Sequence, residues 1–597
     1  MFLQKRHYFF CTILFLVWTG FVVILPVETI GGTGGMENHL TEQENHLSEQ
    51  DIPRLLAGQI EKLQDAAGFE ILQHLEGGVH GHHAGHPVKC LTPWILLYGE
   101  IKDHIDPHIR KQIEEILAFD QQTAETYISP SGRFHLDFFR EGTHAVPGKD
   151  ENASGIPDYI ERAAEFADYS WQLQVGDLGF EDPVGNTPLL ISFRNIGSRA
   201  YGYTIQQGQT TRIVAHNTFQ NFPPNDDPEG NQMGALKVTI AHELKHSIQF
   251  ATNRWQGDLR NVHWLEMDAT MMENIVYPQV NDYYNYIRGS FGIFGNPGKS
   301  TPVAYHHVTW SLFYADHLGM EYWVDVWREV RDEHLIRMER AMKQALHDNP
   351  DTGERRFREL FTRNHIWHAT SGSRTVEGYG FTESEAYPDA RMEQVYQPVP
   401  ELFTVTDELG SLSGVYKMFY PGLGQIGPVT FSATYDQNTL GIGVLGYHRD
   451  GGALEWIVPM DENGTTQAAS RFSVAELDSF LLVVVNAGRD VNVSYTIEMN
   501  IESIPEVVTL ESNYPNPFSG AAGNYSTTIA FSVPEREHAT ILVYDVLGRK
   551  VARLFDQEVE PGRYTVLFDA RGLSSGVYIY QLRTGSLSKT GKMTYIR

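Results

Sequence analysis

Two kinds of hydrophobic spacing separate helical from strand-forming parts of the chain. In one kind, apolar side chains recur at every fourth position: Leu236, Ile240, Leu244 and Ile248. This spacing places them on one buried face of a helix. In the other kind, apolar and polar residues alternate, as at Phe134, Leu136 and Phe138, which predicts a strand. Strands are also expected at 188–193 and 200–205, so that a small sheet precedes the helix.

The same analysis divides the rest of the chain. Helices are expected across 52–124, for example at 101–119, and again from the 236–248 helix to about residue 363. Short strands broken by Gly, Asp and Asn turns, such as 429–435, 440–447 and 480–485, predict a β-sandwich at 400–502. A second β domain follows at 509–597. The fold class is therefore expected to be multidomain α+β, ending in two β-sandwich domains.

The 236–248 helix carries residues that can bind a metal. Its segment IAHELKHS contains His-Glu-x-x-His at His242, Glu243 and His246. Two histidines four residues apart lie on the same side of a helix, so both rings can reach one metal ion. The glutamate between them can take a proton from water at the open position of that metal. A surface helix with two unrelated histidines is the alternative, and the buried face around the motif argues against it.

A third ligand is expected on a second helix, at 263–277. Its Glu266 would return to the metal after a turn, and Ala269 is small enough to let the two helices approach closely. An ordinary solvated glutamate is the alternative.

This arrangement resembles the gluzincin clan of metallopeptidases, the thermolysin-like group, in which a distant glutamate follows His-Glu-x-x-His. The resemblance implies that His242, His246 and Glu266 bind zinc and that Glu243 is the general base. The chain departs from the thermolysin-like pattern at Thr270, where those enzymes carry an aspartate. The orienting role in this chain can instead fall to one of two acidic residues on the same helix, Asp268 or Glu273.

A donor is also needed for the negative charge that builds on a carbonyl oxygen during peptide hydrolysis. Segment 305–319 resembles the helix that follows the catalytic tyrosine in some gluzincin peptidases. The resemblance gives the role to Tyr305, with His306 or His307 in reserve. A helix-start aromatic packed in the core is an equal alternative.

The loop 150–161 fits a calcium-binding pattern position by position. The expected oxygen donors are Asp150, Asn152, Ser154, the backbone carbonyl of Ile156, Asp158 and Glu161. Gly155 falls where such a loop must turn sharply, and Pro157 indicates a calcium turn that leads into one helix, at about 159–174. The ion would add rigidity. A polar turn with an N-capping aspartate is the alternative.

Charge and the N-terminus narrow the class of protein. The 597 residues carry a formal net charge of −29, and no basic patch is present, so nucleic acid is not an expected partner. Lys5, Arg6 and His7 precede an apolar run from residue 8 to 27, which predicts a signal peptide within 1–30 and export of the protein. An uncleaved anchor is the alternative. A membrane is otherwise expected to matter only through surface attachment.

Only two cysteines occur, Cys11 and Cys90, so the mature chain should hold no internal disulfide. Residues 31–128 are expected to be a helical propeptide ahead of a metallopeptidase domain at 129–395. The position of Cys90 resembles the cysteine switch of secreted zymogens, in which a thiolate occupies the open position of the metal until the propeptide is removed. A buried, inert cysteine is the competing interpretation and the one preferred from the sequence.

The last domain carries a specific set of motifs. They are NYPNPF at 513–518, LVYDVLGR at 542–549, GRY at 562–564 and GVYIY at 576–580. They closely resemble the type A sorting domain of the type IX secretion system. The resemblance implies passage through the outer membrane with the secretion machinery as partner, and then release or attachment at the cell surface.

Together these features predict a secreted zinc endopeptidase acting on proteins or peptides, with Zn2+ as cofactor and Ca2+ as a structural ion. Glu243 and Tyr305 are its expected catalytic residues. A zinc aminopeptidase is less favoured, because no Gly-x-Met-Glu-Asn segment lies between residue 129, the expected start of the metallopeptidase domain, and the helix. A cell-surface binding or adhesion protein with a non-catalytic zinc site is the alternative from a different class.

Overall fold

The computed structural model describes residues 64, 67–68, 70–73, 89–118, 124–197, 200–257, 262–346, 350–400, 402–422, 424–505, 507–520, 525–585 and 587–597. The signal peptide expected at 1–30 lies outside them. The chain divides into two compact units. The first holds residues up to 357 together with 386–388, and the second holds 358–385 and 389–597. None of the helices in the described ranges is long and apolar enough to cross a membrane.

Two short helices precede the sheet of the first unit. The structure has α3 (Thr92–Ile101) and α4 (Pro107–Leu117), so the helix expected at 101–119 instead begins at Pro107, after a break that follows α3. The side chain of Asp106 accepts hydrogen bonds from the backbone N–H groups of His108 and Ile109. Aspartate at the N-cap and proline at the first helical position both favour the start of a helix. The pair Asp106–Pro107 therefore begins a new helix.

The sheet of the first unit has five strands in the order β1-β2-β3-β5-β4. They are β1 (Glu125–Ile128), β2 (Phe134–Phe138), β3 (Leu189–Arg194), β4 (Gly202–Gln207) and β5 (Thr210–His216). The alternation in β2 is confirmed, because Phe134, Leu136 and Phe138 are fully buried. Since β1 pairs with β2, the sheet begins at Glu125. The domain boundary expected at residue 129 therefore falls inside the sheet and needs correction.

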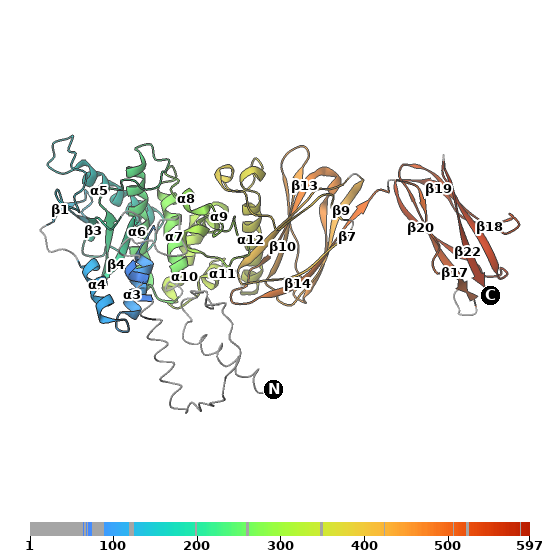
Figure 1. The fold of residues 1–597 in the computed structure, drawn as a ribbon, viewed down its shortest axis with the longest axis horizontal. Coiled ribbons are helices and arrows are strands. Elements are labelled where there is room, and N and C mark those ends of the chain that lie inside the picture. The colour runs from blue at the N-terminus through green and yellow to red at the C-terminus, as the bar shows by residue number, and fades with distance from the viewer. Residues whose placement is uncertain are drawn as a thin grey trace, which may run out of the picture. The chain divides into compact units, whose positions relative to one another are not determined.

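The central helix of the first unit is α6 (Asn231–Asn253), which carries the His-Glu-x-x-His segment. It packs on β4 and β5 and against α5 (Asp158–Trp171), α7 (Val262–Val276) and α10 (Met320–Asp332) (Figure 1). Every residue from Gly234 to Phe250 is buried, Lys237 and Lys245 included. A helix enclosed in this way has no solvent face, so α6 is buried all round and not only on the face that its leucines and isoleucines define.

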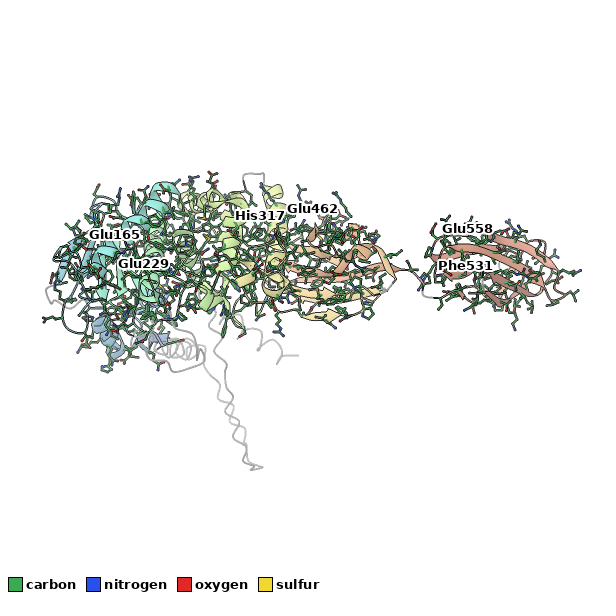
Figure 2. All side chains as sticks on the ribbon, turned by 90° about the horizontal axis from the view of Figure 1, so that it is seen from above. Glu165, Glu229, His317, Glu462, Phe531 and Glu558 are labelled. Atoms are coloured by element: carbon green, nitrogen blue, oxygen red, sulfur yellow. The ribbon has the colours of Figure 1, made fainter. Side chains whose placement is uncertain are left out.

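Helix α5 ends earlier than the expected residue 174 and continues as a π-helical turn, η1 (Gln172–Asp177). On the outside, Arg162 of α5 forms ion pairs with Glu165 and with Glu229, the second at 2.8 Å; both glutamates are labelled in Figure 2.

Mostly helical sequence follows α7, as expected. It forms α8 (Tyr284–Ile287), η3 (Ala304–His307), α9 (Val308–Leu318), α10, α11 (Met338–Gln344) and α12 (Pro350–Ala369), with η4 (Gly372–Arg374) and η5 (Ser384–Ala386) beyond. Large aromatic side chains fill the space between α7 and α9, where the rings of Trp264 and Trp310 meet edge to face at 5.8 Å.

The first predicted β-sandwich is confirmed as two sheets, with strand orders β11-β10-β13-β8-β6 and β12-β9-β14-β7. The strands are β6 (Gln394–Tyr396), β7 (Leu402–Leu409), β8 (Ser413–Phe419), β9 (Gln425–Tyr435), β10 (Leu440–His448), β11 (Ala453–Ile457), β12 (Thr465–Ser473), β13 (Leu477–Asn486) and β14 (Val493–Ser503), with a 3-10 turn, η6 (Val474–Glu476), before β13. Side chains from both sheets, among them Phe431 and Phe480, form one apolar core. Because β6 pairs with β8, this domain begins before residue 400.

The last domain also consists of two sheets, with orders β15-β17-β20 and β16-β22-β21-β18-β19. The strands are β15 (Thr509–Leu510), β16 (Phe518–Ser519), β17 (Ser526–Val533), β18 (Glu537–Asp545), β19 (Lys550–Val559), β20 (Gly562–Asp569), β21 (Gly576–Arg583) and β22 (Ser588–Ile596). Its core includes Phe518, Phe568 and Tyr580. The multidomain α+β class is therefore confirmed.

Candidate metal centre

Helices α6 and α7 bring three of the expected ligands to one point. The Nε2 atoms of His242 and His246 lie 3.1 Å apart. The two carboxylate oxygens of Glu266 lie 3.3 Å from His242 Nε2 and 3.2 Å from His246 Nε2. All three residues are buried. Spacing along α6 aligns the two imidazoles, and the packing of α7 on α6 supplies the carboxylate.

A fourth side chain, Cys90, joins this group. Its Sγ lies 3.4 Å from His246 Nε2. Four residues each offer one potential ligand atom, and these atoms all lie within 4.8 Å of one another: Cys90, His242, His246 and Glu266. They make up the metal-binding group that is found among the described residues. The thiol is buried, as the preferred interpretation of the sequence expected. Its place beside both histidines is where the cysteine-switch resemblance put it.

Hydrogen bonds on the far side of each imidazole orient the rings. His242 Nδ1 lies 2.7 Å from Glu273 Oε1, and His246 Nδ1 lies 2.8 Å from Gln249 Oε1. When each Nδ1 donates to its oxygen partner, the lone pair of Nε2 faces the cluster. Gln249 in turn donates to Asp268 at 2.7 Å. Both acidic residues expected to orient a histidine therefore do so, Asp268 through Gln249. The sequence analysis missed Gln249, although its position one turn after His246 was a usable signal.

The chemistry of the four side chains fits a zinc ion. Neither buried oxygen of Glu266 has a hydrogen-bond partner, although both lie close to imidazole nitrogens. Burial alone would lower the pKa of His242, but Glu266 and Glu273 outweigh it and raise that pKa to about 10. The enclosed carboxylates thus favour a positive charge at this point, which a proton or a cation can supply. Imidazole, carboxylate and thiolate donors together suit zinc better than calcium or magnesium.

Glu243 lies next to the cluster and is itself buried. Its Oε2 accepts a hydrogen bond of 2.8 Å from the hydroxyl of Thr204 and lies 3.5 Å from that of Thr92. Burial raises the pKa of Glu243, while the charges of His246 and His242 oppose the shift.

Strand β4 approaches Glu243 closely because its first residue is a glycine. A Cβ atom at Gly202 would stand only 3.0 Å from Glu243 Oε1.

Tyr305 belongs to η3, directly before α9, and its ring packs on that of Tyr286 at 4.9 Å. Burial, and then the charges of Glu266 and Cys90, raise the pKa of its phenol. The two reserve histidines make other contacts. His306 Nδ1 lies 2.6 Å from the backbone oxygen of Tyr286, and His307 Nδ1 accepts a hydrogen bond from the N–H of Val303.

The expected calcium loop is folded around its own polar groups. The carboxylate of Asp150 accepts hydrogen bonds from the backbone N–H groups of Ser154 and Gly155, and that of Asp158 accepts one from Glu151. Asn152 Nδ2 donates to Glu161 at 2.8 Å. Gly155 has a φ of 87°, as the expected sharp turn requires. The loop leads into one helix, α5. Calcium at this loop stays a prediction.

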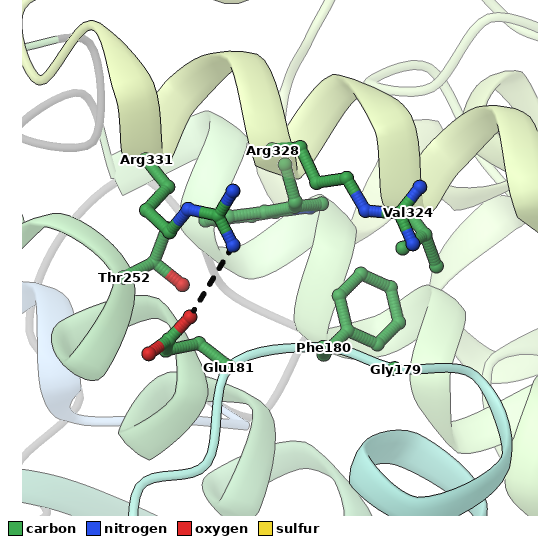
Figure 3. Close-up of a pocket in the computed structure, with 8 residues that line it drawn as sticks. Gly179, Phe180, Glu181, Thr252, Val324, Arg328 and Arg331 are labelled. Carbon is green, nitrogen blue, oxygen red and sulfur yellow. Dashed lines mark ion pairs between the residues drawn. The ribbon is translucent and has the colours of Figure 1, made fainter.

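A surface depression lies near the C-terminal end of α6 (Figure 3). Its lining includes Phe180, Thr252 and Val324, and an ion pair of 3.8 Å joins Arg331 to Glu181 across it. None of its lining residues belongs to the metal-binding group.

One comparison with known proteins is specific. The model of the secretion system C-terminal sorting domain family matches residues 512–596. The last domain therefore directs the protein through type IX secretion, to the cell surface or into the medium, and the machinery of that system is a partner.

The other comparisons are uninformative. No curated protein matches the chain. Two of the solved structures that match show weak similarity. A β-1,2-glucanase from Parabacteroides distasonis is 10% identical with a TM-score of 0.14, over 30% of each chain. The CupB2 chaperone of Pseudomonas aeruginosa is 8% identical with a TM-score of 0.09, over 30% of this chain and 91% of the chaperone. Similarities this weak carry no argument about activity.

Proposed function

We propose that the first unit is a zinc-dependent endopeptidase of the gluzincin type. One observation carries the proposal: His242 Nε2, His246 Nε2 and the Glu266 carboxylate lie within 3.1–3.3 Å of one another. Two histidines and a glutamate are a known ligand set of catalytic zinc. Zinc held by these residues would supply a Lewis acid that polarises the scissile carbonyl and lowers the pKa of water.

Two other residues would handle the proton and the developing charge. Glu243 would take a proton from the attacking water on its carboxylate and pass it to the leaving amine. The hydrogen bond from Thr204 holds that carboxylate in place. The hydroxyl of Tyr305 would donate to the oxygen on which negative charge builds.

A peptide substrate is supported by the edge of β4. This strand is the last in its sheet, and it starts beside Glu243. The backbone on this edge already hydrogen-bonds to the residues that lead into α3: Leu91 N–H donates to the Gly202 oxygen at 3.1 Å, and Tyr201 N–H donates to the Lys89 oxygen at 2.9 Å. An edge whose backbone groups bond another segment in this way can also bond a peptide.

The test is hydrolysis of casein by the zinc-loaded protein, both as the full-length chain and after limited proteolysis has removed residues 89–92 from the β4 edge. Glu243→Gln should lower the rate by about 10²–10⁴-fold and leave the zinc content unchanged, because Glu243 is not a ligand. Glu165→Gln, a surface change of the same kind, is the matched control. Full activity in Glu243→Gln would refute the proposed role. A zinc-binding protein that cleaves nothing even after residues 89–92 have been removed would favour the binding or adhesion function.

A further inference from the structure

We infer that Cys90 is a fourth ligand of the metal at this cluster, and that the segment Lys89–Thr92 keeps the peptidase site closed in a latent form. The latency rests on the proposed function, whereas the bond between thiol and metal can be tested without it.

Two independent observations support the bond. The sulfur lies 3.4 Å from His246 Nε2, and its place in the group of four leaves all their ligand atoms within 4.8 Å. The carboxylate of Glu266, only 1% exposed, points into the same space with neither oxygen hydrogen-bonded. Four protein ligands make a closed zinc site, whereas a catalytic site keeps one position open. Cys90 therefore occupies the position that the reaction needs.

The backbone of the segment is fixed to the sheet on both sides of the thiol. Lys89 and Leu91 form the two hydrogen bonds with the β4 edge described above, and Cys90 itself pairs in parallel with Gly202. The hydroxyl of Thr92 accepts a further hydrogen bond from the N–H of Thr204 at 2.8 Å. The chain thus places its own residues 89–92, which lead into α3, where a peptide substrate would add to the sheet.

The side chain of Lys89 anchors the same segment beside the metal-binding group, through a carboxylate that orients one of the ligands. Its ammonium is 1% exposed and forms ion pairs with Glu273, at 2.6 Å, and with Asp282. Glu273 is also the residue that orients His242. The segment is therefore tied to the ligands at two adjacent positions, through the sulfur of Cys90 and through the charge of Lys89.

The covered site is closed to substrate. Cys90 is 2% exposed, Glu243 1% and His246 0%. Thr92 Oγ1 stands between the thiol, at 3.1 Å, and Glu243 Oε2, at 3.5 Å. A peptide carbonyl can reach Glu243 only after this segment has left, so hydrolysis requires its cleavage or displacement.

The experiment replaces zinc with Co2+ in the full-length protein and records its absorption. A cobalt–thiolate bond gives a charge-transfer band that imidazole and carboxylate ligands lack. We expect this band in the wild-type protein and its loss in both Cys90→Ser and Cys90→Ala, with the d–d bands of bound cobalt retained. Thr92→Val is the matched control, because it changes the same buried segment but keeps the thiol, and its band should persist. A wild-type protein without the band would overturn the ligand assignment.

Two further measurements complete the test. The first uses a Cys11→Ser chain, in which Cys90 is the sole thiol and residue 90 itself is unchanged. The metal-loaded protein should react with a thiol reagent far more slowly than the protein from which a chelator has removed the metal. Equal rates would also overturn the ligand assignment. Azide should shift the cobalt spectrum of Cys90→Ala but not that of the wild type, because only the variant has an open position. A wild-type spectrum that azide shifts equally would overturn latency, whether or not the protein proves to be a peptidase.

Discussion

Lys89 should be among the most costly charged residues to remove from the first unit. In Lys89→Met the new side chain has a similar length, so it keeps the contacts with the rings of Tyr201 and Tyr286. The Lys89 ammonium lies 5.1 and 4.9 Å from the centres of these two rings. The charge is lost, however, and the carboxylates of Glu273 and Asp282 remain buried without their partner. Removing one member of a buried ion pair costs about 3–5 kcal/mol.

The loss can be measured by urea unfolding followed through tryptophan fluorescence. The signal comes mainly from the first unit, which contains Trp94, Trp171, Trp255, Trp264, Trp310, Trp323 and Trp327. With a urea dependence of about 3 kcal/mol per M, the midpoint should fall by roughly 1–2 M. Lys111→Met is the control, because Lys111 forms an exposed pair of 3.6 Å with Glu115, worth at most about 1 kcal/mol. Equal losses in the two variants would show that the buried pairing is not stabilising.

The same ion pair predicts a dependence on pH. Burial by itself would lower the pKa of Lys89, but Asp282 and Glu273 outweigh it and raise that pKa above its ordinary value of 10.5. The single ammonium of Lys89 pairs with two carboxylates. Burial therefore still raises the pKa of Asp282, although Lys89 acts to lower it. A raised lysine pKa gives stability that is complete below pH 10.5 and is lost as the pH rises through the folded-state pKa. The wild type should lose stability in that alkaline range, and Lys89→Met should lose much less; parallel curves would contradict the assignment.

Two predictions concern the metal ligands and the last domain. Glu273→Gln should weaken zinc affinity by about 10–100-fold, because it replaces the carboxylate that orients His242 at 2.7 Å. Competition with a chelator of known affinity measures the change, with Glu321→Gln at an exposed position of α10 as control. An unchanged affinity would show that Glu273 does not orient a metal ligand. A chain that ends at residue 505 should be retained inside the cell envelope, because the sorting domain at 512–596 is missing; fractionation followed by immunoblotting checks this, and unimpaired release would mean that another segment directs export.

Much of the secondary structure and domain organisation could be predicted from local sequence patterns. The alternation of Phe134, Leu136 and Phe138 predicted β2, and the turn-rich stretches predicted both β-sandwiches. The motif helix was also predicted, but only one face of it could be recognised as buried. The burial of Lys237 and Lys245 depends on neighbours outside the helix: Lys237 pairs with Asp227 at 2.8 Å, and Lys245 lies over the ring of Phe180 at 3.3 Å. Hydrophobic periodicity predicts which positions avoid water. It does not predict which partner will stabilise a buried charged residue.

The candidate site shows the same division. The chain sequence alone determined that His242 and His246 share a helix face, because four residues make about one turn, and it marked the last domain as a sorting domain. Only the tertiary structure decided that Glu266 reaches the two imidazoles, that Gln249 and Glu273 orient them, and that Cys90 joins them beside β4. Helical spacing is fixed by backbone geometry within a few residues, whereas the meeting of Cys90 with α6 depends on how a sheet edge, a loop and two helices pack together. Packing of that kind is set by all their side chains at once, and so no local pattern at residue 90 could distinguish a ligand from an inert thiol.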